Sequence, residues 1–312
     1  LKDYVARDPR TEKAAAVNFP VHAHDKYRID TDATRELLAE HQPELVILGK
    51  SMVLYPEPVA ELRRFIDDLG LDTFLMYDMA HVLGLVGPHF QQPFEEGADI
   101  VTGSTHKTFF GTQRGVIGSR FTEHDVLYPF WEAVERRAFP GAVSNHHLGT
   151  LLGLLMAAYE MNAFKAEYQP AVIANAKSFA KALKDCGLKV SGDPEVGYTQ
   201  THQVLLDVGW TRGPEIARRL EENNIIVNYQ AAPDEEGFTA SGALRMGVSE
   251  MTRFGMGPGE FGELAEFIRD VITNDATVKP RVAEFRKRFL EMQYCFTAKE
   301  LEERLGQLHQ MV

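Results

Sequence analysis

Short apolar runs alternate with helical patterns in the first half of the chain. Three of these runs, at 44–48, 73–77 and 98–102, are each followed by polar residues. A continuous apolar run of this length is typical of a strand buried on both faces. Polar residues at the carboxyl ends of such strands predict an α/β sheet that carries a site at its strand ends.

Helical spacing predicts the remaining elements. A capping residue followed by regularly spaced Ala and Leu predicts a helix over 31–40, and prolines open another over 59–69. Further along, the pattern predicts helices at 148–162, 170–186 and 214–223, and strands at 189–190, 203–207 and 225–228. The tail 278–312 is amphipathic, with mixed charge, and predicts a packed terminal pair of helices.

Length and charge narrow the class of protein. A chain of 312 residues can bury a substantial core, and we expect a large domain over 1–162 and a small one over 163–312. With 33 basic and 45 acidic residues the formal net charge is −12. This balance argues against nonspecific binding to nucleic acid or to an anionic membrane.

Two features favour a cytoplasmic location. Cys186 and Cys295 are the only cysteines, so no disulfide framework is implied and a reducing compartment suits the chain. No apolar run approaches membrane-spanning length, and the first five residues lack the apolar core of a signal peptide.

The candidate chemistry begins with one acid and one amine. Asp78 directly follows the run 73–77, and an Asp at a strand end can pair with a ring nitrogen and keep it protonated. Lys107 lies on the loop after 98–102, where it can form a Schiff base, which is how pyridoxal phosphate is held. Taken singly, each has a plainer explanation, as a cap or turn residue and as a solvated charge.

The order of the motifs is more specific than either residue. Asp78-Met-Ala-His81 is followed by Ser104-Thr-His-Lys107 and then by Arg114 between glycines. This set resembles the serine hydroxymethyltransferase family of fold-type I pyridoxal-phosphate enzymes, from about Val17 to about Val271. The resemblance implies an aspartate-aminotransferase-like α/β fold. It has a large domain built on a mostly parallel, seven-stranded type of sheet, and a small α/β C-terminal domain.

The resemblance also implies roles for the motif residues. Lys107 would carry pyridoxal 5'-phosphate, and Asp78 would keep its ring cationic, so that the ring can take up electrons left on Cα. His81 would contact the cofactor's phenolic oxygen or the substrate carboxylate, and His106 would move protons near the Schiff base. Ser104 fits the family's hydroxyl three residues before the Lys. For both histidines the alternative is a structural role.

Four residues outside these motifs complete the implied site. Ser51 matches a family position near cofactor and substrate, although a simple turn serine is the alternative. Ser144 and Asn145 replace a Gly-Gly pair that approaches the partner subunit's cofactor phosphate, and they can cap the following helix and donate to an anion. Arg245, close to glycines on a short predicted strand, suits a bidentate clamp on an α-carboxylate.

Several features depart from the family pattern. The family's N-terminal segment, with its active-site tyrosines, glutamate and ring-stacking His, has no counterpart here. His22 and His24 are better explained as loop residues before a strand than as substitutes for that His. The link from Lys107 to Arg114 is one residue longer than usual, and Gln230 stands where a folate-contacting Asn is expected.

Three functions compete. The first is folate-dependent interconversion of serine and glycine by Cα–Cβ (retro-)aldol chemistry, with tetrahydrofolate as co-substrate. The second is a folate-independent L-threonine aldolase or transaldolase that makes β-hydroxy amino acids, and the third is a noncatalytic scaffold. Intact motif residues weigh against the third, and the breadth of the resemblance slightly favours the first. We expect an amino-acid substrate (glycine, serine or threonine), an aldehyde or folate, a homodimer or dimer of dimers, and no metal.

Overall fold

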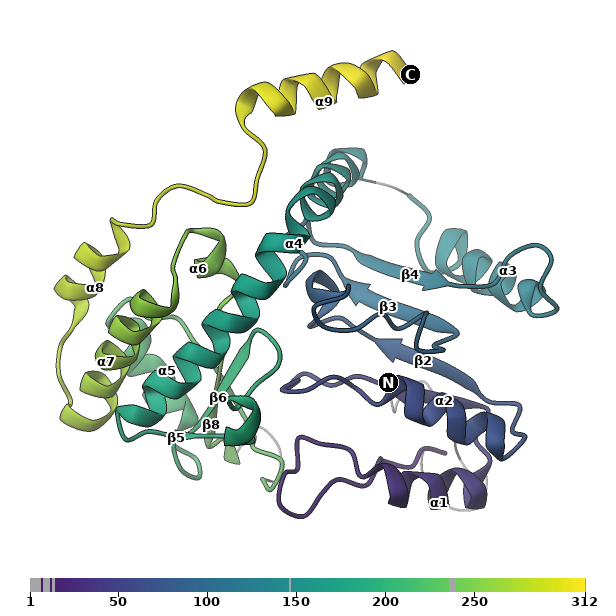
Figure 1. The fold of residues 1–312 in the computed structure, drawn as a ribbon, viewed down its shortest axis with the longest axis horizontal. Coiled ribbons are helices and arrows are strands. Elements are labelled where there is room, and N and C mark those ends of the chain that lie inside the picture. The colour runs from purple at the N-terminus through teal and green to yellow at the C-terminus, as the bar shows by residue number, and fades with distance from the viewer. Residues whose placement is uncertain (1–6, 8–11, 13–14, 146, 236–239, 312) are drawn as a thin grey trace.

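The computed structural model describes residues 7, 12, 15–145, 147–235 and 240–311, which form two sheets with flanking helices (Figure 1). The first sheet has the order β1-β2-β3-β4 and the second β5-β6-β8-β7. The strands of the first sheet are β1 (Leu45–Leu48), β2 (Phe74–Asp78), β3 (Ile100–Ser104) and β4 (Gly115–Ser119).

The first sheet brings three strand ends to one edge. Strands β1, β2 and β3 run parallel, with Leu48 opposite Tyr77 and Asp78 opposite Thr102, and β4 is antiparallel to β3. Among the described residues the sheet has four strands, whereas a seven-stranded type was expected. Three of the four strands, β1 to β3, are the ones that the apolar runs of this chain predict, and the larger number was carried over from the whole family enzyme.

Two helices beside this sheet confirm their predicted positions. Helix α1 (Thr31–His41) begins after Asp30, whose carboxylate caps it by accepting from the N–H of Ala33. Helix α2 (Val59–Asp68) follows Pro58 and buries one face, which includes Leu62. His22 and His24 are exposed, and no strand follows them; the chain instead leads through an isolated bridge into α1.

The helices predicted at 148–162 and 170–186 form one helix, α4 (Leu148–Asp185), with Pro170 inside it. An interior proline removes one backbone hydrogen bond, and this cost usually ends a helix. Here the second half of α4 is buried against α7 (Pro258–Asn274), with the rings of Phe179 and Phe261 5.3 Å apart. Packing therefore outweighs the proline. The proposed domain boundary falls within α4, and the division into two domains stays a prediction.

The second sheet is antiparallel and is made of β5 (Lys189–Val190), β6 (Gln203–Asp207), β8 (Ala243–Gly247) and β7 (Asn228–Gln230). Helix α5 (Gly213–Glu222) precedes β7. The strand predicted at 225–228 starts only at its last residue. Ile225 lies in the turn that follows α5, where its N–H donates to the carbonyl of Leu220, and Ile226 is exposed.

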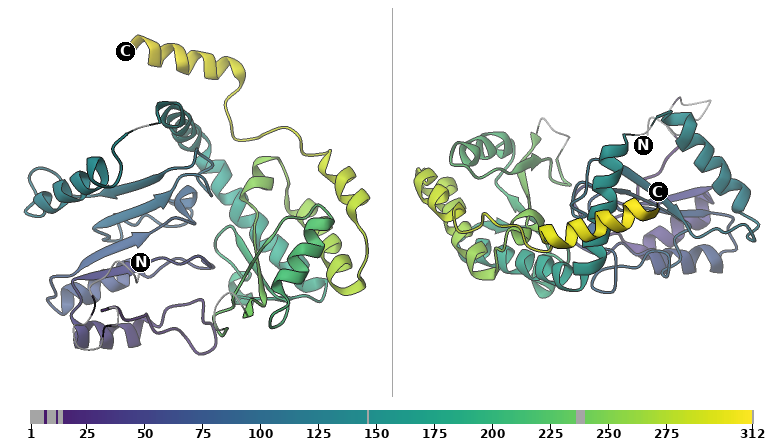
Figure 2. Two further views of the ribbon diagram at one scale, coloured as in Figure 1. Left: turned by 180° about the vertical axis from the view of Figure 1, so that it is seen from behind. Right: turned by 90° about the horizontal axis from the view of Figure 1, so that it is seen from above.

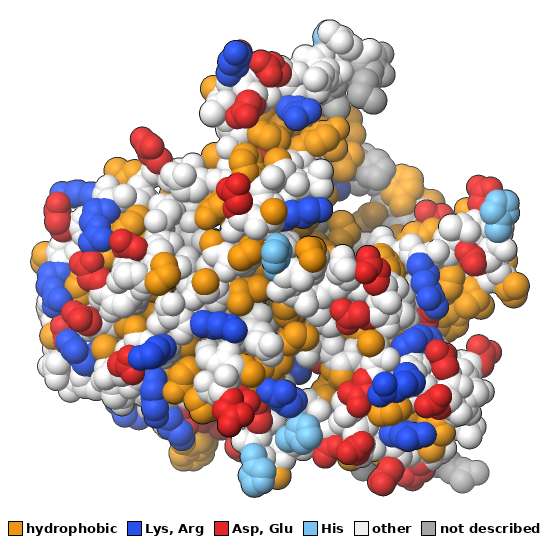
Figure 3. Space-filling model, in the orientation of Figure 1, with side chains coloured by type: hydrophobic (Ala, Val, Ile, Leu, Met, Phe, Trp, Pro, Cys, Tyr) orange, Lys and Arg blue, Asp and Glu red, His pale blue; other side chains and the backbone are white. Residues whose placement is uncertain are grey.

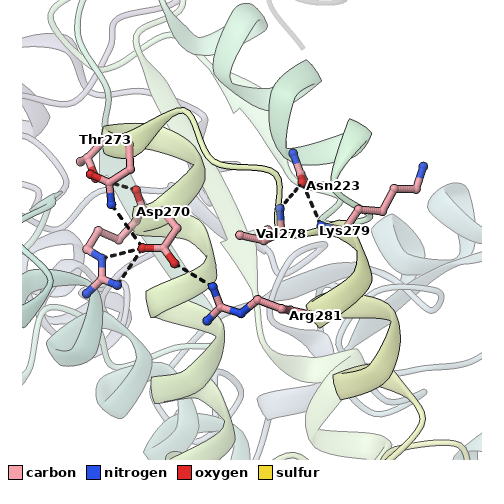
Figure 4. A network of polar contacts seen from close by, with 8 residues as sticks. Asn223, Asp270, Thr273, Val278, Lys279 and Arg281 are labelled. Atoms are coloured by element: carbon pink, nitrogen blue, oxygen red, sulfur yellow. Dashed lines mark hydrogen bonds and ion pairs between the residues drawn. The ribbon is translucent and has the colours of Figure 1, made fainter.

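The tail is not the packed helix pair that was expected. Helix α8 (Lys279–Arg286) contacts the helices beside the second sheet (Figure 4). Arg281 pairs with Asp270 of α7, and Asn223, directly after α5, accepts from two backbone N–H groups at the start of α8. Helix α9 (Ala298–Met311) stands apart from it (Figure 2). The segment between them separates the helices, and Arg304 of α9 instead lies over the ring of Tyr159 on α4.

Acidic and basic side chains are interspersed on the face shown in Figure 3, with no single basic patch on that face. None of the helices in the described residues combines the length and the apolar character needed to cross a membrane.

Candidate active site

The carboxyl ends of β1 and β2 approach each other closely. Gly49, directly after β1, has a φ of +120°, and a Cβ added there would lie 2.3 Å from the carbonyl oxygen of Asp78. Only glycine adopts this conformation easily and leaves room for the approach. The close contact sets the loop that carries Ser51 beside the loop that carries His81.

Lys107 lies on the loop after β3, with its Nζ 3.5 Å from Nε2 of His81. The loop is fixed by Thr105, whose hydroxyl lies 2.6 Å from the carbonyl of Thr112, and by Tyr168, whose hydroxyl donates to the carbonyl of Thr108. Burial lowers the pKa of Lys107. The nearby Arg245 lowers it further, whereas Asp78 acts in the opposite direction. A lowered pKa increases the fraction of neutral amine, the form that can attack a carbonyl.

His81 is held as a neutral imidazole. Burial is the largest cause, and the positive charges of Lys107 and Arg245 add to it, so the pKa of His81 falls to about 4. A neutral imidazole has one N–H donor and one acceptor nitrogen, so it can pass a proton at neutral pH.

Arg245 reaches this edge from the second sheet. Its Nη1 donates to the carbonyl of Ser51 at 3.0 Å, and the Ser51 hydroxyl lies 3.3 Å from Oε1 of Gln230. His81, His106, Lys107 and Arg245 line one cavity of about 830 Å³. An amine, a neutral imidazole and a guanidinium therefore face one space large enough for a cofactor and a small substrate.

The chain matches the family model described as serine hydroxymethyltransferase over residues 12–268. This chain belongs to the serine hydroxymethyltransferase family. It is 42% identical over 276 residues to a serine hydroxymethyltransferase of Pyrobaculum aerophilum, which covers 87% of this chain and 62% of the relative. A serine hydroxymethyltransferase of Korarchaeum cryptofilum is 44% identical over 277 residues, with 86% and 62% covered. The chain thus spans about 62% of the length of these curated relatives.

A solved structure also resembles this chain in fold. The crystal structure of an L-threonine transaldolase from Pseudomonas fluorescens, in the internal aldimine state, superposes with a TM-score of 0.82 at 32% identity. The match covers 93% of this chain and 66% of that one. It confirms the predicted fold-type I α/β class.

The residues fit the cofactor that this family implies. Oδ1 of Asp78 accepts from the N–H of Ala80 at 3.1 Å, and Oδ2 accepts no hydrogen bond from the described part of the chain. The carboxylate therefore has an oxygen available for a ring N–H, and Lys107 has an amine of lowered pKa. The roles of both residues stay predictions.

The other predicted site residues differ in their placement. Ser104 ends β3, partly buried and paired with Gly115 across the sheet, and His106 is exposed at the cavity. Ser144 and Asn145 lie in an exposed loop and are not among the residues that line the cavity. Neither residue holds the N-cap position of α4, which is His147, and their role toward a cofactor phosphate stays a prediction.

Sequence reasoning missed Gln203, whereas His202 matches a family histidine that enters the same strand. Gln203 is buried and its amide reaches both Ser51 and His81, and His202 lines the same cavity. A signal was present, since a polar Gln begins the strand directly before three apolar residues. Burial, with smaller contributions from three positive or histidine neighbours, lowers the pKa of His202 to about 3.

The lowered pKa of His202 predicts that the free energy of unfolding falls in acid. This pKa is about 6.5 unfolded and about 3 folded, so the unfolded state binds the extra proton and stability is lost as pH falls below 6.5. We expect His202 alone to remove about 2 kcal/mol of unfolding free energy between pH 7 and pH 5. Urea unfolding at the two pH values measures this loss, with His202→Asn as the test and exposed His24→Asn as the control. An equal loss in parent and His202→Asn would contradict the assignment.

Proposed function

We propose that the protein is a pyridoxal-phosphate enzyme of the serine hydroxymethyltransferase type, which interconverts serine and glycine at the Cα–Cβ bond. One observation carries the proposal. Lys107, on the loop after β3 of the first sheet, and Arg245, on β8 of the second sheet, line one cavity together with neutral His81. Family membership and the names of the relatives support it.

Each residue has a definite task in this proposal. When bound, the cofactor takes up the electron pair that remains on Cα as a bond to that carbon breaks. Lys107 holds the cofactor, and Asp78 holds a proton on the ring nitrogen through its available oxygen. Arg245 orients the substrate carboxylate with its planar guanidinium. His81, neutral at physiological pH, offers a hydrogen bond beside Lys107, and His106 moves protons near the Lys107 amine.

Exposed apolar side chains support a homodimer or a dimer of dimers. They gather at the start of α4 and just before it, where a soluble monomer would place polar residues: Phe139, Val143, Leu148, Leu151, Leu152 and Tyr159. A cytoplasmic location belongs to the same proposal and is supported by the two free cysteines.

The experiment that tests this function is product analysis with Cβ-labelled serine, with and without tetrahydrofolate. Label that appears in the folate pool together with unlabelled glycine supports the proposal. If glycine forms at no detectable rate from serine or any other β-hydroxy amino acid, while the cofactor is bound, the proposal is overturned.

Folate-independent threonine aldolase or transaldolase activity is the second candidate, and Gln230 favours it. The Gln230 amide faces the hydroxyl of Ser51, at the position where the family places a folate-contacting Asn. Its extra methylene shifts the amide, and exposed Tyr229 adds bulk beside it. The structural relative is named as an L-threonine transaldolase.

If this second candidate is the function, tetrahydrofolate should bind weakly and threonine should be cleaved without it. A misplaced hydrogen-bond partner costs roughly 1–3 kcal/mol, so Gln230→Asn should strengthen folate binding by about tenfold. Folate is titrated against the exchange of the glycine Cα hydrogen, and acetaldehyde release from threonine is measured in parallel. Strong folate enhancement in the parent, with no acetaldehyde, would end the second candidate and leave the first.

A further inference from the structure

The side chain of Gln203 links the two sheets beside the candidate site. Gln203 is the first residue of β6 and is only 1% exposed. Its Oε1 accepts from the N–H of Val53 at 2.9 Å, and its Nε2 donates to the carbonyl of Ser51 at 3.1 Å. The same Nε2 lies 3.4 Å from Nδ1 of His81.

The two backbone contacts fix which way this amide points. A backbone N–H can only donate and a backbone carbonyl can only accept, so the oxygen must face Val53 and the NH₂ group must face Ser51. Turning the amide over would leave two donors facing each other at Val53 and two acceptors facing each other at Ser51. In a buried position both groups would then lose their hydrogen bonds, which is costly.

The fixed amide decides the state of His81. Its NH₂ group has no lone pair to offer, so Nδ1 of His81 can only be the acceptor in this contact and carries no proton. The proton of the neutral imidazole is then on Nε2, the nitrogen that faces Nζ of Lys107 at 3.5 Å.

We propose that Gln203 is a positioning residue that holds His81 in the Nε2-protonated tautomer, with its N–H directed at the Lys107 amine. This proposal rests on the proposed function for its catalytic meaning, but its structural content does not depend on that function. An N–H directed at Nζ is accepted by the lone pair of a neutral amine, whereas an ammonium group offers only protons. Gln203 thereby acts through His81 to favour the reactive form of Lys107.

The charged and titratable groups around His81 act in the same direction. Lys107 and Arg245 from β8 both disfavour a second proton on the imidazole, and His202 beside β6 is itself held neutral by burial. Within the described part of the chain, Asp78 is the acidic group that acts on Lys107. Gln203 adds the choice between the two neutral tautomers, which the surrounding charges alone do not make.

A second contact of Gln203, with the Ser51 carbonyl, reaches Arg245, the residue proposed to orient the substrate carboxylate. The Ser51 carbonyl that it holds also accepts from Nη1 of Arg245 at 3.0 Å. One amide thus fixes both the imidazole beside the amine and the carbonyl that orients the guanidinium. Loss of Gln203 should disturb both ends of the site, through contacts that involve no direct approach to a substrate.

The direct test is ¹⁵N NMR of histidine-labelled protein after removal of the cofactor, with the His81 signals identified by their loss in His81→Asn. We expect a pyridine-type Nδ1 and a pyrrole-type Nε2 at pH 7. A pyrrole-type Nδ1, or rapid averaging of the two tautomers, would overturn the proposal. This spectrum of the unsubstituted protein decides the matter even if variants fold poorly.

Two variants separate positioning from mere packing. In Gln203→Glu a carboxylate faces Nδ1 of His81 and should move the imidazole proton from Nε2 to Nδ1. Gln203→Met has a side chain of similar length that forms no hydrogen bonds, so both neutral tautomers of His81 should be populated. The pH at which Lys107 reacts with a small aldehyde and cyanoborohydride should rise by about one unit in Gln203→Glu. Identical spectra and pH profiles in all three proteins would refute the role. Because neither readout needs cofactor or substrate, a failed proposed function would not mask the result.

Discussion

Replacing Lys107 with alanine is expected to reduce turnover at least about a thousandfold, roughly 4 kcal/mol of lost barrier lowering, and to let the cofactor dissociate. The reason is chemical: Lys107 supplies the amine of lowered pKa at the cavity, beside neutral His81. Turnover of β-hydroxy amino acids and cofactor retention through gel filtration measure the two effects.

The matched control is Lys165→Ala on the exposed face of α4, which should behave as the parent protein. Retained cofactor and near-parental turnover in Lys107→Ala would show that another lysine holds the cofactor. Loss of folding is excluded by comparing the far-ultraviolet circular dichroism of the two variants.

Asp78→Asn is expected to impair chemistry far more than cofactor occupancy. An amide matches the carboxylate in size but cannot stabilise a protonated ring nitrogen, so the ring draws electrons from Cα less strongly. We expect the exchange of the glycine Cα hydrogen for deuterium to slow by roughly 100-fold, about 2.7 kcal/mol. The bound cofactor, measured by its absorbance after gel filtration, should fall much less.

Exposed Asp72, just before β2, provides the control as Asp72→Asn. Near-normal exchange in Asp78→Asn would remove the ring-pairing role from this residue. Loss of cofactor in proportion to the loss of exchange would assign Asp78 to binding rather than to chemistry.

The sequence predicted the parts of this fold whose patterns are set locally. The runs at 44–48, 73–77 and 98–102 became β1, β2 and β3, because short apolar runs suit strands, although burial alternates along β1 and β2 instead of covering both faces, and Leu45 is exposed. Pro170 misled the prediction for α4, because the packing of its second half against α7 is a tertiary effect that propensity does not contain. The placement of α9 away from α8 is likewise tertiary.

The site residues also divide into those that local patterns place and those that only long-range contacts place. Asp78, His81 and Lys107 follow predicted strands, so their convergence could be expected from parallel topology. Arg245 could be proposed only from resemblance, because no local pattern places a strand of the second sheet against the first. Gln203 was missed because its importance lies in three long-range contacts, with residues far from it in the chain.

One measurement tests the central claim most directly. The protein with its bound cofactor is reduced with borohydride, digested, and mapped by mass spectrometry for the pyridoxyl-phosphate adduct. The account predicts a single modified peptide, the one that contains Lys107. An adduct on a different lysine, or a cofactor that is bound but forms no adduct at all, would contradict it.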